Sequence, residues 1–274
     1  MPELILPASL AVLLLGLTAS ASWGVSDFAG GWLSRRAPLL GVALGTQLVG
    51  LMLALGAAIA RGEPALGPGD IGWAVLSGLL ASVGLAALYG GLAVGRMGIV
   101  APVTGLLVAS IPVIAGTALQ GLPPPVTLLG IGLAIVAVVV VSLSPGDVTD
   151  GPSGLRHALV AGLTLGLLTV VMSRFGEGRV FLPLALMRLV EALAFIAFIL
   201  VRRPRWRLGR SLWPAAIGIG AVDLLGNGAY VAATQTGALA IAAVLSSLYP
   251  VVTVLLATFL LGARVGRLHA AGIV

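Results

Sequence analysis

The sequence predicts an all-α polytopic membrane protein, and three observations support this prediction: its composition, the spacing of its apolar segments and an internal repeat. Of the 274 residues, 59% are hydrophobic and only 9% are charged, and the mean hydropathy is +1.16. A soluble domain has about 45–50% apolar and about 25% charged residues. This chain lacks the polar side chains to cover a water-exposed surface, so a soluble fold and disorder are both excluded.

Short polar breaks divide the chain into apolar segments of nearly constant length. A spanning helix takes about 20 apolar residues, and we expect such helices at about residues 7–33, 38–60, 71–95, 98–120, 126–143, 155–173, 181–201, 212–236 and 238–261. Residues 268–274 begin a further apolar segment that would rise only about 10 Å. The chain therefore has nine full spans and a stub, or its tenth helix is cut short.

The two halves of the sequence carry the same landmarks in the same order. Gly162-Leu163-Thr164 repeats Gly16-Leu17-Thr18. Further matched pairs are Trp73 with Trp213, Gly78 with Gly218, Tyr89 with Tyr230, Ala101 with Ala242, and Pro112 with Pro250. Their offsets stay between 138 and 147 residues, and a polar segment at 144–154 separates the halves. We expect two repeats, at 1–146 and 155–274.

Each repeat would contain five helices, and this odd number has a topological consequence. Two such units joined in series must enter the membrane from opposite sides. An inverted-topology repeat is typical of secondary transporters that alternate access around a central site. Chance similarity between small apolar helices is the alternative explanation.

The distribution of arginine predicts the orientation in the membrane. All 15 basic residues are arginine, and 11 of them lie in the loops that follow the odd-numbered spans, against three in the loops after residues 38–60 and 155–173. Basic residues favour the cytoplasmic side, so we expect segment 202–210 in the cytoplasm and the N-terminus outside it. Because topology accounts for the net charge of +6, no nucleic-acid partner is expected.

Ionisable residues inside a span are costly and usually functional. Asp223, Asn227 and Tyr230 follow at i, i+4 and i+7, which places them on one helix face. A carboxylate, an amide and a phenol in line can bind a polar substrate at mid-membrane. The alternative is a polar clamp between helices, worth about 1 kcal/mol.

Two further spans carry ionisable residues. Asp27 follows Trp23 by one helical turn and either lines a cavity or reaches toward Arg35 and Arg36 at the membrane surface. Arg188 and Glu191 stand three apart and can neutralise each other, which favours a structural role. A proton relay through Glu191 is the alternative.

Helix-distorting residues occur in the same spans. Pro102, Pro112 and Pro250 lie inside predicted helices and are candidate hinges, because proline removes one backbone hydrogen bond. We expect the spans at 7–33, 71–95, 155–173 and 212–236 to line a central cavity, since Trp23, Tyr89, Asn227 and Tyr230 lie at their mid-points.

Enzyme motifs are nearly absent from the sequence. The chain has no Cys and no Lys, and His157 and His269 lie at helix ends, so we expect no catalytic residue, no metal and no cofactor. Residues 151–154 match the G-x-S-G of intramembrane serine proteases. Ser153 lies in a polar segment without a mid-membrane His to activate it, and we expect it to cap the next helix.

Three stretches resemble one transporter family. Residues 22–28 (SWGVSDF) resemble the W-G-x-x-[ND]-F signature of the EamA domain in the drug/metabolite transporter (DMT) superfamily. Residues 87–102 resemble its A-L-x-x-x-x-A … [VL]-A-P pattern, and residues 248–262 resemble its L-x-P-V … L-L-G block. Leu122 and Ala263 stand where the family has Glu.

The resemblance implies a ten-helix DMT fold of two tandem EamA domains and a transporter without an organic cofactor. We therefore expect a secondary transporter of small metabolites, such as amino acids or related compounds, or of drugs, that works by alternating access. Proton coupling would use Asp27, Glu191 or Asp223. A passive facilitator or channel and a non-transport sensor are the alternatives.

The expected partners follow from these interpretations. They are a small-molecule substrate and the lipid bilayer, with the protein as a multi-pass component of a bacterial plasma (inner) membrane. The sequence leaves open whether the protein is a monomer or a homodimer.

Overall fold

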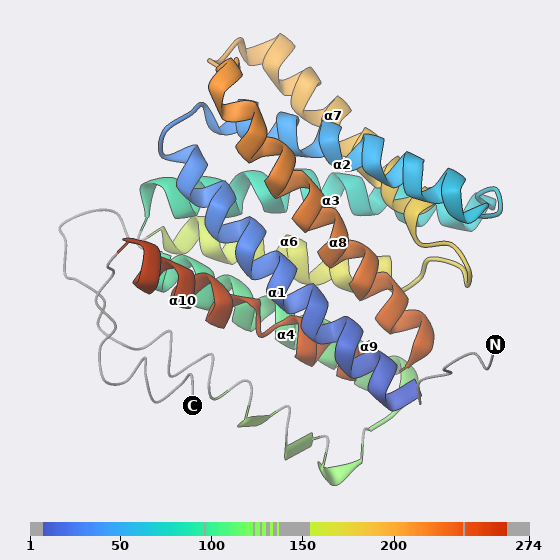
Figure 1. Ribbon diagram of the computed structural model, residues 1–274. Coiled ribbons are helices and arrows are strands. Elements are labelled where there is room, and N and C mark those ends of the chain that lie inside the picture. Colours follow the sequence, from blue (N-terminus) through green and yellow to red (C-terminus); the bar gives the residue numbers. More distant parts are fainter. Residues whose placement is uncertain are drawn as a thin grey trace.

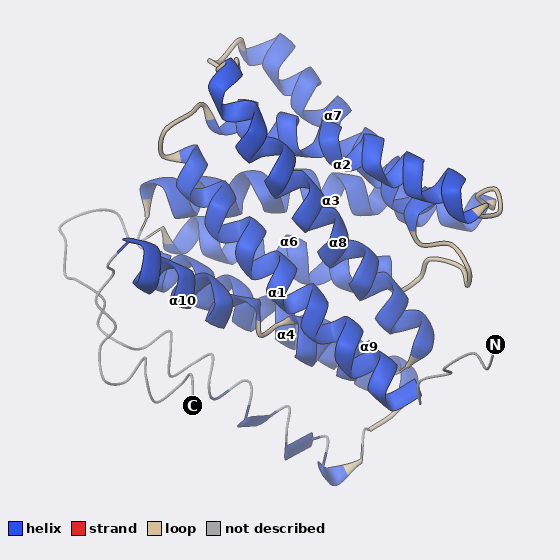
Figure 2. Cartoon of the chain, in the orientation of Figure 1, coloured by secondary structure: helices blue, strands red, loops and turns tan. Residues whose placement is uncertain are grey.

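The structure, a computed structural model, describes residues 8–95, 97–122, 154–237 and 239–261, with a few positions between 124 and 136. Within these ranges the secondary structure is helical and contains no strand (Figure 2). Eight helical segments are long and apolar enough to cross a membrane. The all-α membrane class is therefore confirmed for the described residues. Most of the span expected at 126–143, nearly all of the polar segment and residues 268–274 lie outside them.

The first half contributes four helices, in close agreement with the expected spans. They are α1 (Ala8–Ser34), α2 (Leu39–Arg61), α3 (Pro68–Val94) and α4 (Met97–Gln120). Helix α2 ends at Gly62, whose φ of +62° favours glycine. Helix α3 starts with Pro68 in its first turn, and Asp70 accepts a hydrogen bond from the Gly67 amide at 3.2 Å. Together, a glycine stop and a capped proline start fix the turn between α2 and α3.

The second half contributes the remaining helices. They are α6 (Leu155–Met172), α7 (Phe181–Arg202), the short 3-10 helix η1 (Arg210–Leu212), α8 (Trp213–Thr236), α9 (Leu239–Ser246) and α10 (Tyr249–Leu261). The single helix expected at 238–261 is thus broken into α9 and α10. Pro250 accounts for the break, because it has no N–H for the Ser246 carbonyl and its ring displaces the preceding turn.

The helices pair in a pattern that is the same when the two halves are exchanged (Figure 1). Helix α1 packs against α8, and its counterpart α6 packs against α3. Helix α4 packs on α6 as α9 and α10 pack on α1, and α3 contacts α7 as α2 contacts α8. Helices α2 and α7, which correspond to each other in the two halves, also contact each other. The repeat found in the sequence is therefore present in the packing.

The two halves run in opposite directions. At the C-terminal end of α1, Arg35 Nη2 donates to the Leu92 carbonyl oxygen near the end of α3, at 2.8 Å. At the N-terminal start of α6, Gly154 lies against Gly95 at the same end of α3, where a Cβ on Gly95 would come within 2.9 Å of the Gly154 Cα. The end of α1 and the start of α6 thus share one end of the bundle, so α1 and α6 are antiparallel.

Matched glycines allow matched helix crossings. A Cβ on Gly16 would lie 2.7 Å from the Leu245 Cβ, and one on Gly162 would lie 2.7 Å from the Leu107 Cβ. Gly162 is the repeat counterpart of Gly16, and Leu245 follows Leu107 by the 138 residues that separate Pro250 from Pro112. The same close approach of small residues therefore occurs once in each half.

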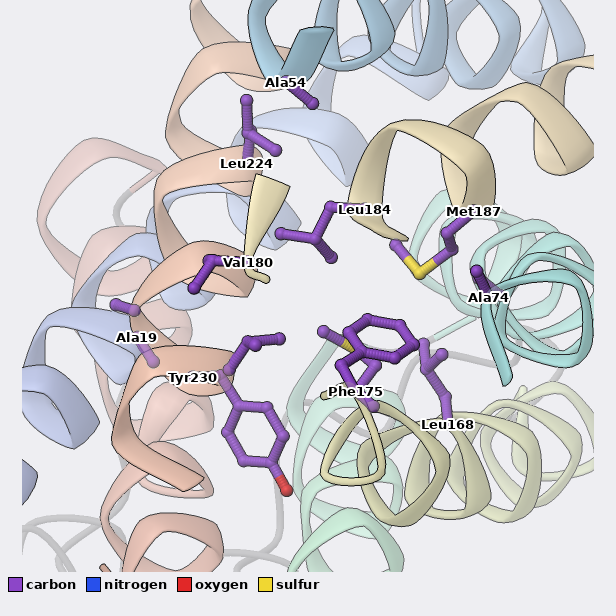
Figure 3. Packing of buried hydrophobic residues seen from close by; sticks show 14 of the residues in the cluster. Ala19, Ala54, Ala74, Leu168, Phe175, Val180, Leu184, Met187, Leu224 and Tyr230 are labelled. Carbon is purple, nitrogen blue, oxygen red and sulfur yellow. The ribbon is translucent and has the colours of Figure 1, made fainter. Parts of the chain in front are cut away.

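Of the three buried apolar clusters, the two largest occupy opposite ends of the bundle. The first surrounds Leu168, Phe175, Leu184 and Tyr230 and draws on α1, α2, α3, α6, α7 and α8 (Figure 3). The second contains Leu33, Leu88, Tyr89, Val100 and Ile219. The first cluster lies toward the loops that join α2 to α3 and α6 to α7, and the second lies toward the opposite end. Space between the clusters is available for a site.

Candidate functional site

A central cavity lies at mid-span between the two halves. Its volume is about 70 Å³ measured to the centres of water-sized spheres, and since one water needs roughly 10–15 Å³ by that measure, it holds on the order of five waters. Its polar or aromatic lining residues are Trp23, Asp27, Thr169, Arg188, Glu191, Asp223, Asn227 and Tyr249. The remainder of the wall is apolar, with residues from α3, α4, α6 and α7.

Arg188 is the centre of the polar network beside this cavity. Its guanidinium donates to Gln47 Oε1 of α2 and to Asp223 Oδ2 of α8, and Nη1 also lies 3.3 Å from Glu191 Oε2 on its own helix. The Arg188 and Glu191 side chains are 3% and 1% exposed. A buried cation needs partners that replace its lost water, and here the partners come from three helices.

The repeat relates the two sides of this network. Gln47 precedes Arg188 by 141 residues, the offset that relates Tyr89 to Tyr230, and Gly50 precedes Glu191 by the same number. Gln47 and Arg188 therefore occupy equivalent places in α2 and α7 and bond to each other. A Cβ on Gly50 would lie 3.2 Å from Arg188 Nε. Because Gly50 has no side chain, there is room for the Arg188 side chain. At these two equivalent positions the first half has Gln47 and Gly50, and the second half has the charged pair Arg188 and Glu191.

Asp223 and Asn227 lie together on the cavity side of α8. Asn227 Nδ2 donates to Asp223 Oδ2 at 3.2 Å and to the Asp223 carbonyl oxygen at 3.0 Å. Tyr230, the third member of the predicted face, lies deeper: its hydroxyl donates to the Thr169 carbonyl oxygen at 3.0 Å. The structure therefore brings Asp223 and Asn227 to the cavity and uses Tyr230 to join α8 to α6.

Asp27 lines the cavity from α1, and its two neighbouring arginines have other partners. Arg35 bonds to the Leu92 carbonyl oxygen, and the Arg36 guanidinium lies 3.9 Å from the centre of the Trp32 ring. Within the part of the chain that the structure describes, neither a hydrogen bond nor an ion pair reaches the Asp27 carboxylate. Of the two interpretations of Asp27, this arrangement favours a carboxylate that lines the cavity over one that reaches toward Arg35 and Arg36.

Two aromatic rings gather around that of Trp23, which lies one helical turn before Asp27. The Trp23 ring centre lies 5.4 Å from that of Tyr230 and 6.3 Å from that of Tyr249, the second pair edge to face. Trp23 can approach α8 this closely because position 226 is glycine, where a Cβ would lie 2.7 Å from the Trp23 Cδ1. Tyr249 is the first residue of α10 after the break, and its hydroxyl is buried without a hydrogen-bond partner among the residues that the structure describes.

The remaining predicted residues lie around the cavity rather than on it. Tyr89 is buried, with its ring against Gly30 of α1, and it is absent from the described residues that line the cavity. Helix α4 continues through both Pro102 and Pro112. Of the three proline positions, only the one at 250 coincides with a break in the helix.

A second polar cluster joins the halves at one end of the bundle, through what we call the docked loops, residues 62–67 and 173–180. The buried Glu63 carboxylate accepts hydrogen bonds from the Val180, Phe181 and Leu182 amides at the start of α7, at 2.8–3.1 Å. Asp70 accepts a hydrogen bond from the Gly176 amide at 2.8 Å and lies 3.4 Å from Arg179 Nη1. The carboxylates of one half thus cap and hold the loop of the other.

Sequence reasoning missed two residues of the site, Gln47 and Tyr249. The repeat offset could have found Gln47, since it is the counterpart of Arg188. Tyr249 had a weaker signal, its place directly before a proline inside a span. Neither side chain is charged at neutral pH, so the criterion of an ionisable residue inside a span selects neither of them.

Comparisons with known proteins agree with this architecture. One solved crystal structure of a protein aligns with a TM-score of 0.74 over 95% of this chain and 93% of that chain, at 21% sequence identity. At this identity the likeness shows the fold alone. No curated protein matches the chain. The model of the EamA-like transporter family matches residues 10–143 and 152–274. The chain belongs to the EamA-like transporter family, and its two matched stretches are the two repeats of a multi-pass membrane protein of the DMT superfamily.

Proposed function

We propose that the protein is a secondary transporter that moves a small metabolite or drug by alternating access, with the central cavity as its substrate site. The observation that carries this proposal is the position of the cavity. It lies at mid-span, between two antiparallel repeats, and both repeats supply polar lining residues, Asp27 from one and Asp223 from the other. Family membership supports the same function.

The two apolar clusters suggest how access alternates. Leu168 and Met187 of the first cluster line the cavity on the side of the docked loops, and Leu88 of the second cluster lines it on the opposite side. Rocking one repeat against the other would open one cluster while the other stays packed, since the helix contacts of each half are repeated in the other. We place the docked loops outside the cell, as the arginine distribution requires for a plasma membrane.

We assign proton coupling to Asp223 rather than to Glu191. Both carboxylates pair with Arg188, but the Asp223 side chain is 19% exposed and that of Glu191 is 1% exposed. A proton that enters the cavity can therefore reach Asp223. Protonation would remove the charge that holds Arg188 to α8, which gives the coupling a structural consequence.

The test compares Asp223→Asn with Glu191→Gln in proteoliposomes, with a panel of radiolabelled amino acids and small amines. Each substitution replaces a carboxylate by an amide of nearly equal size. We expect Asp223→Asn to lose uptake driven by a pH gradient while exchange of labelled for unlabelled substrate continues. We expect Glu191→Gln to lower thermal stability more than it lowers gradient-driven uptake.

Three other results would contradict this proposal in different ways. Full gradient-driven uptake in Asp223→Asn would remove that residue from coupling. Wild-type flux that ignores the pH gradient would indicate a passive facilitator. Absence of flux for every member of the panel, in protein that is folded and inserted, would indicate a sensor.

A further inference from the structure

The charges around the central cavity do not balance. Among the described residues that line it, Arg188 is the only basic one, and it faces three carboxylates, Asp27, Glu191 and Asp223. Fully ionised, the lining carries a net charge of −2. Arg188 is bound by Glu191 and Asp223 and balances one of these two charges, while Asp27 is the lining carboxylate that has no basic partner among the described residues. A cation that entered the cavity would restore part of the balance.

The surroundings of Asp27 fit an organic cation. The Trp23 ring lies one helical turn from it, and Tyr249 lies edge-on to Trp23. Aromatic faces attract ammonium groups, and the effect is larger where water is excluded. Tyr249 is 3% exposed, and within the described part of the chain its hydroxyl has no hydrogen-bond partner. A buried hydroxyl without a hydrogen-bond partner is costly. The Tyr249 hydroxyl oxygen could accept a hydrogen bond from an ammonium N–H.

A metal ion fits this place less well. Hard cations take six or more oxygen ligands, and the described residues contain no group of three or more His, Cys, Asp or Glu side chains placed to hold one. The rest of the wall consists of apolar side chains such as Leu85, Leu88 and Leu165. Such a wall suits a hydrocarbon body attached to the charged group.

A free carboxylate on the substrate would be unfavourable here. It would lie near Asp27 and Asp223, which interact electrostatically with each other, and the one guanidinium is already bound. We propose that the cavity binds a small organic amine in preference to an amino acid, with the ammonium group between the Asp27 carboxylate and the Trp23 and Tyr249 side chains. This inference rests on the proposed function and names its substrate class.

The test is equilibrium binding of radiolabelled n-butylamine to the purified protein in lipid nanodiscs. Three competitors separate the contribution of the ammonium charge from the effect of a carboxylate. Norvaline is the same molecule with an α-carboxylate added, 1-butanol lacks the positive charge, and butyrate reverses it. We expect saturable butylamine binding below about 10 mM, and competition by the other three at least about tenfold weaker, since one charge-assisted hydrogen bond is worth about that factor.

Variants locate the binding site. We expect Asp27→Asn to weaken butylamine binding by about 10- to 100-fold and Tyr249→Phe by a smaller factor, about 2- to 10-fold. The control is Glu177→Gln, which removes one exposed carboxylate away from the cavity and should leave binding unchanged. The competitor series on the wild-type protein gives its answer even if Asp27→Asn fails to fold.

Several outcomes would overturn the inference: no saturable butylamine binding, norvaline binding as tightly as butylamine, or undiminished binding in folded Asp27→Asn. Uptake assays on the same compounds keep this failure apart from that of the proposed function. Uptake of norvaline as efficient as that of butylamine would contradict the proposed substrate class but not the proposed transport function. Amine binding without uptake of any compound would remove transport and leave the binding class standing.

Discussion

Arg188 shows how a single charged residue is accommodated in the middle of a membrane protein. Its guanidinium can be buried because Gln47, Glu191 and Asp223, from three helices, accept its hydrogen bonds. The glycine at position 50 supplies the space for its side chain. Arg188 therefore holds α2, α7 and α8 together at the depth of the cavity. Its replacement should lower the stability of the protein.

We predict that Arg188→Met lowers the free energy of unfolding by about 3–5 kcal/mol, since it leaves the buried Glu191 and the partly buried Asp223 without their counter-charge. Thermal and denaturant unfolding in detergent would measure the change. Leu189→Met, at an exposed neighbouring position on α7, is the matched control and should change stability little. A double variant with Glu191→Met should recover part of the loss, and a stability equal to wild type in Arg188→Met would contradict the account.

The sequence singles out individual candidate residues more readily than their partners. Ionisable residues inside spans are rare and easily recognised, so Asp27, Arg188, Glu191 and Asp223 all stand out in the sequence. The ion pair between Arg188 and Asp223 is not apparent in the sequence, because it depends on how α7 and α8 both pack against α2 rather than on spacing within one helix. For the same reason, Tyr230 shares a helix face with Asp223 and yet bonds to α6.

At the scale of elements, the helix ends are the places where the two halves hold each other. Helix α7 begins without a side-chain cap of its own. Glu63, 117 residues earlier, supplies the carboxylate that binds its first amides. A helix N-terminus carries a partial positive charge, so an anionic cap is favoured here. Hydropathy predicted where this helix begins, but only the fold brings Glu63 to it.

We predict that Glu63→Ala lowers the free energy of unfolding by about 1–3 kcal/mol, because three amides lose a charge-assisted acceptor. Thermal unfolding in detergent is the measurement. Glu177→Ala removes an exposed carboxylate in the neighbouring loop and should have an effect close to zero. Equal effects of the two substitutions would show that the observed bonds contribute nothing specific.

At the scale of the whole molecule, the inverted repeat relates structure to transport. For the eight expected spans that the structure describes, the outer boundaries agree with the helices to within three residues, because hydropathy is a local property and the bilayer sets helix length. The break between α9 and α10 was marked in the sequence by Pro250, but a proline is equally compatible with the unbroken α4. The missing N–H is therefore not sufficient by itself to break a helix, and Pro250 also packs closely against Gly105 of α4.

Alternating access requires that the docked loops separate in each cycle, and this requirement is the most direct test. The chain has no native Cys, so Ala65→Cys and Arg179→Cys, at positions where the Arg179 side chain bonds to the Ala65 carbonyl oxygen, can be bridged by a short bis-methanethiosulfonate reagent. We predict that the bridged protein loses gradient-driven uptake in proteoliposomes and that reduction restores it, while each single-Cys variant treated in the same way keeps its uptake. Undiminished uptake with bridging complete would contradict the account.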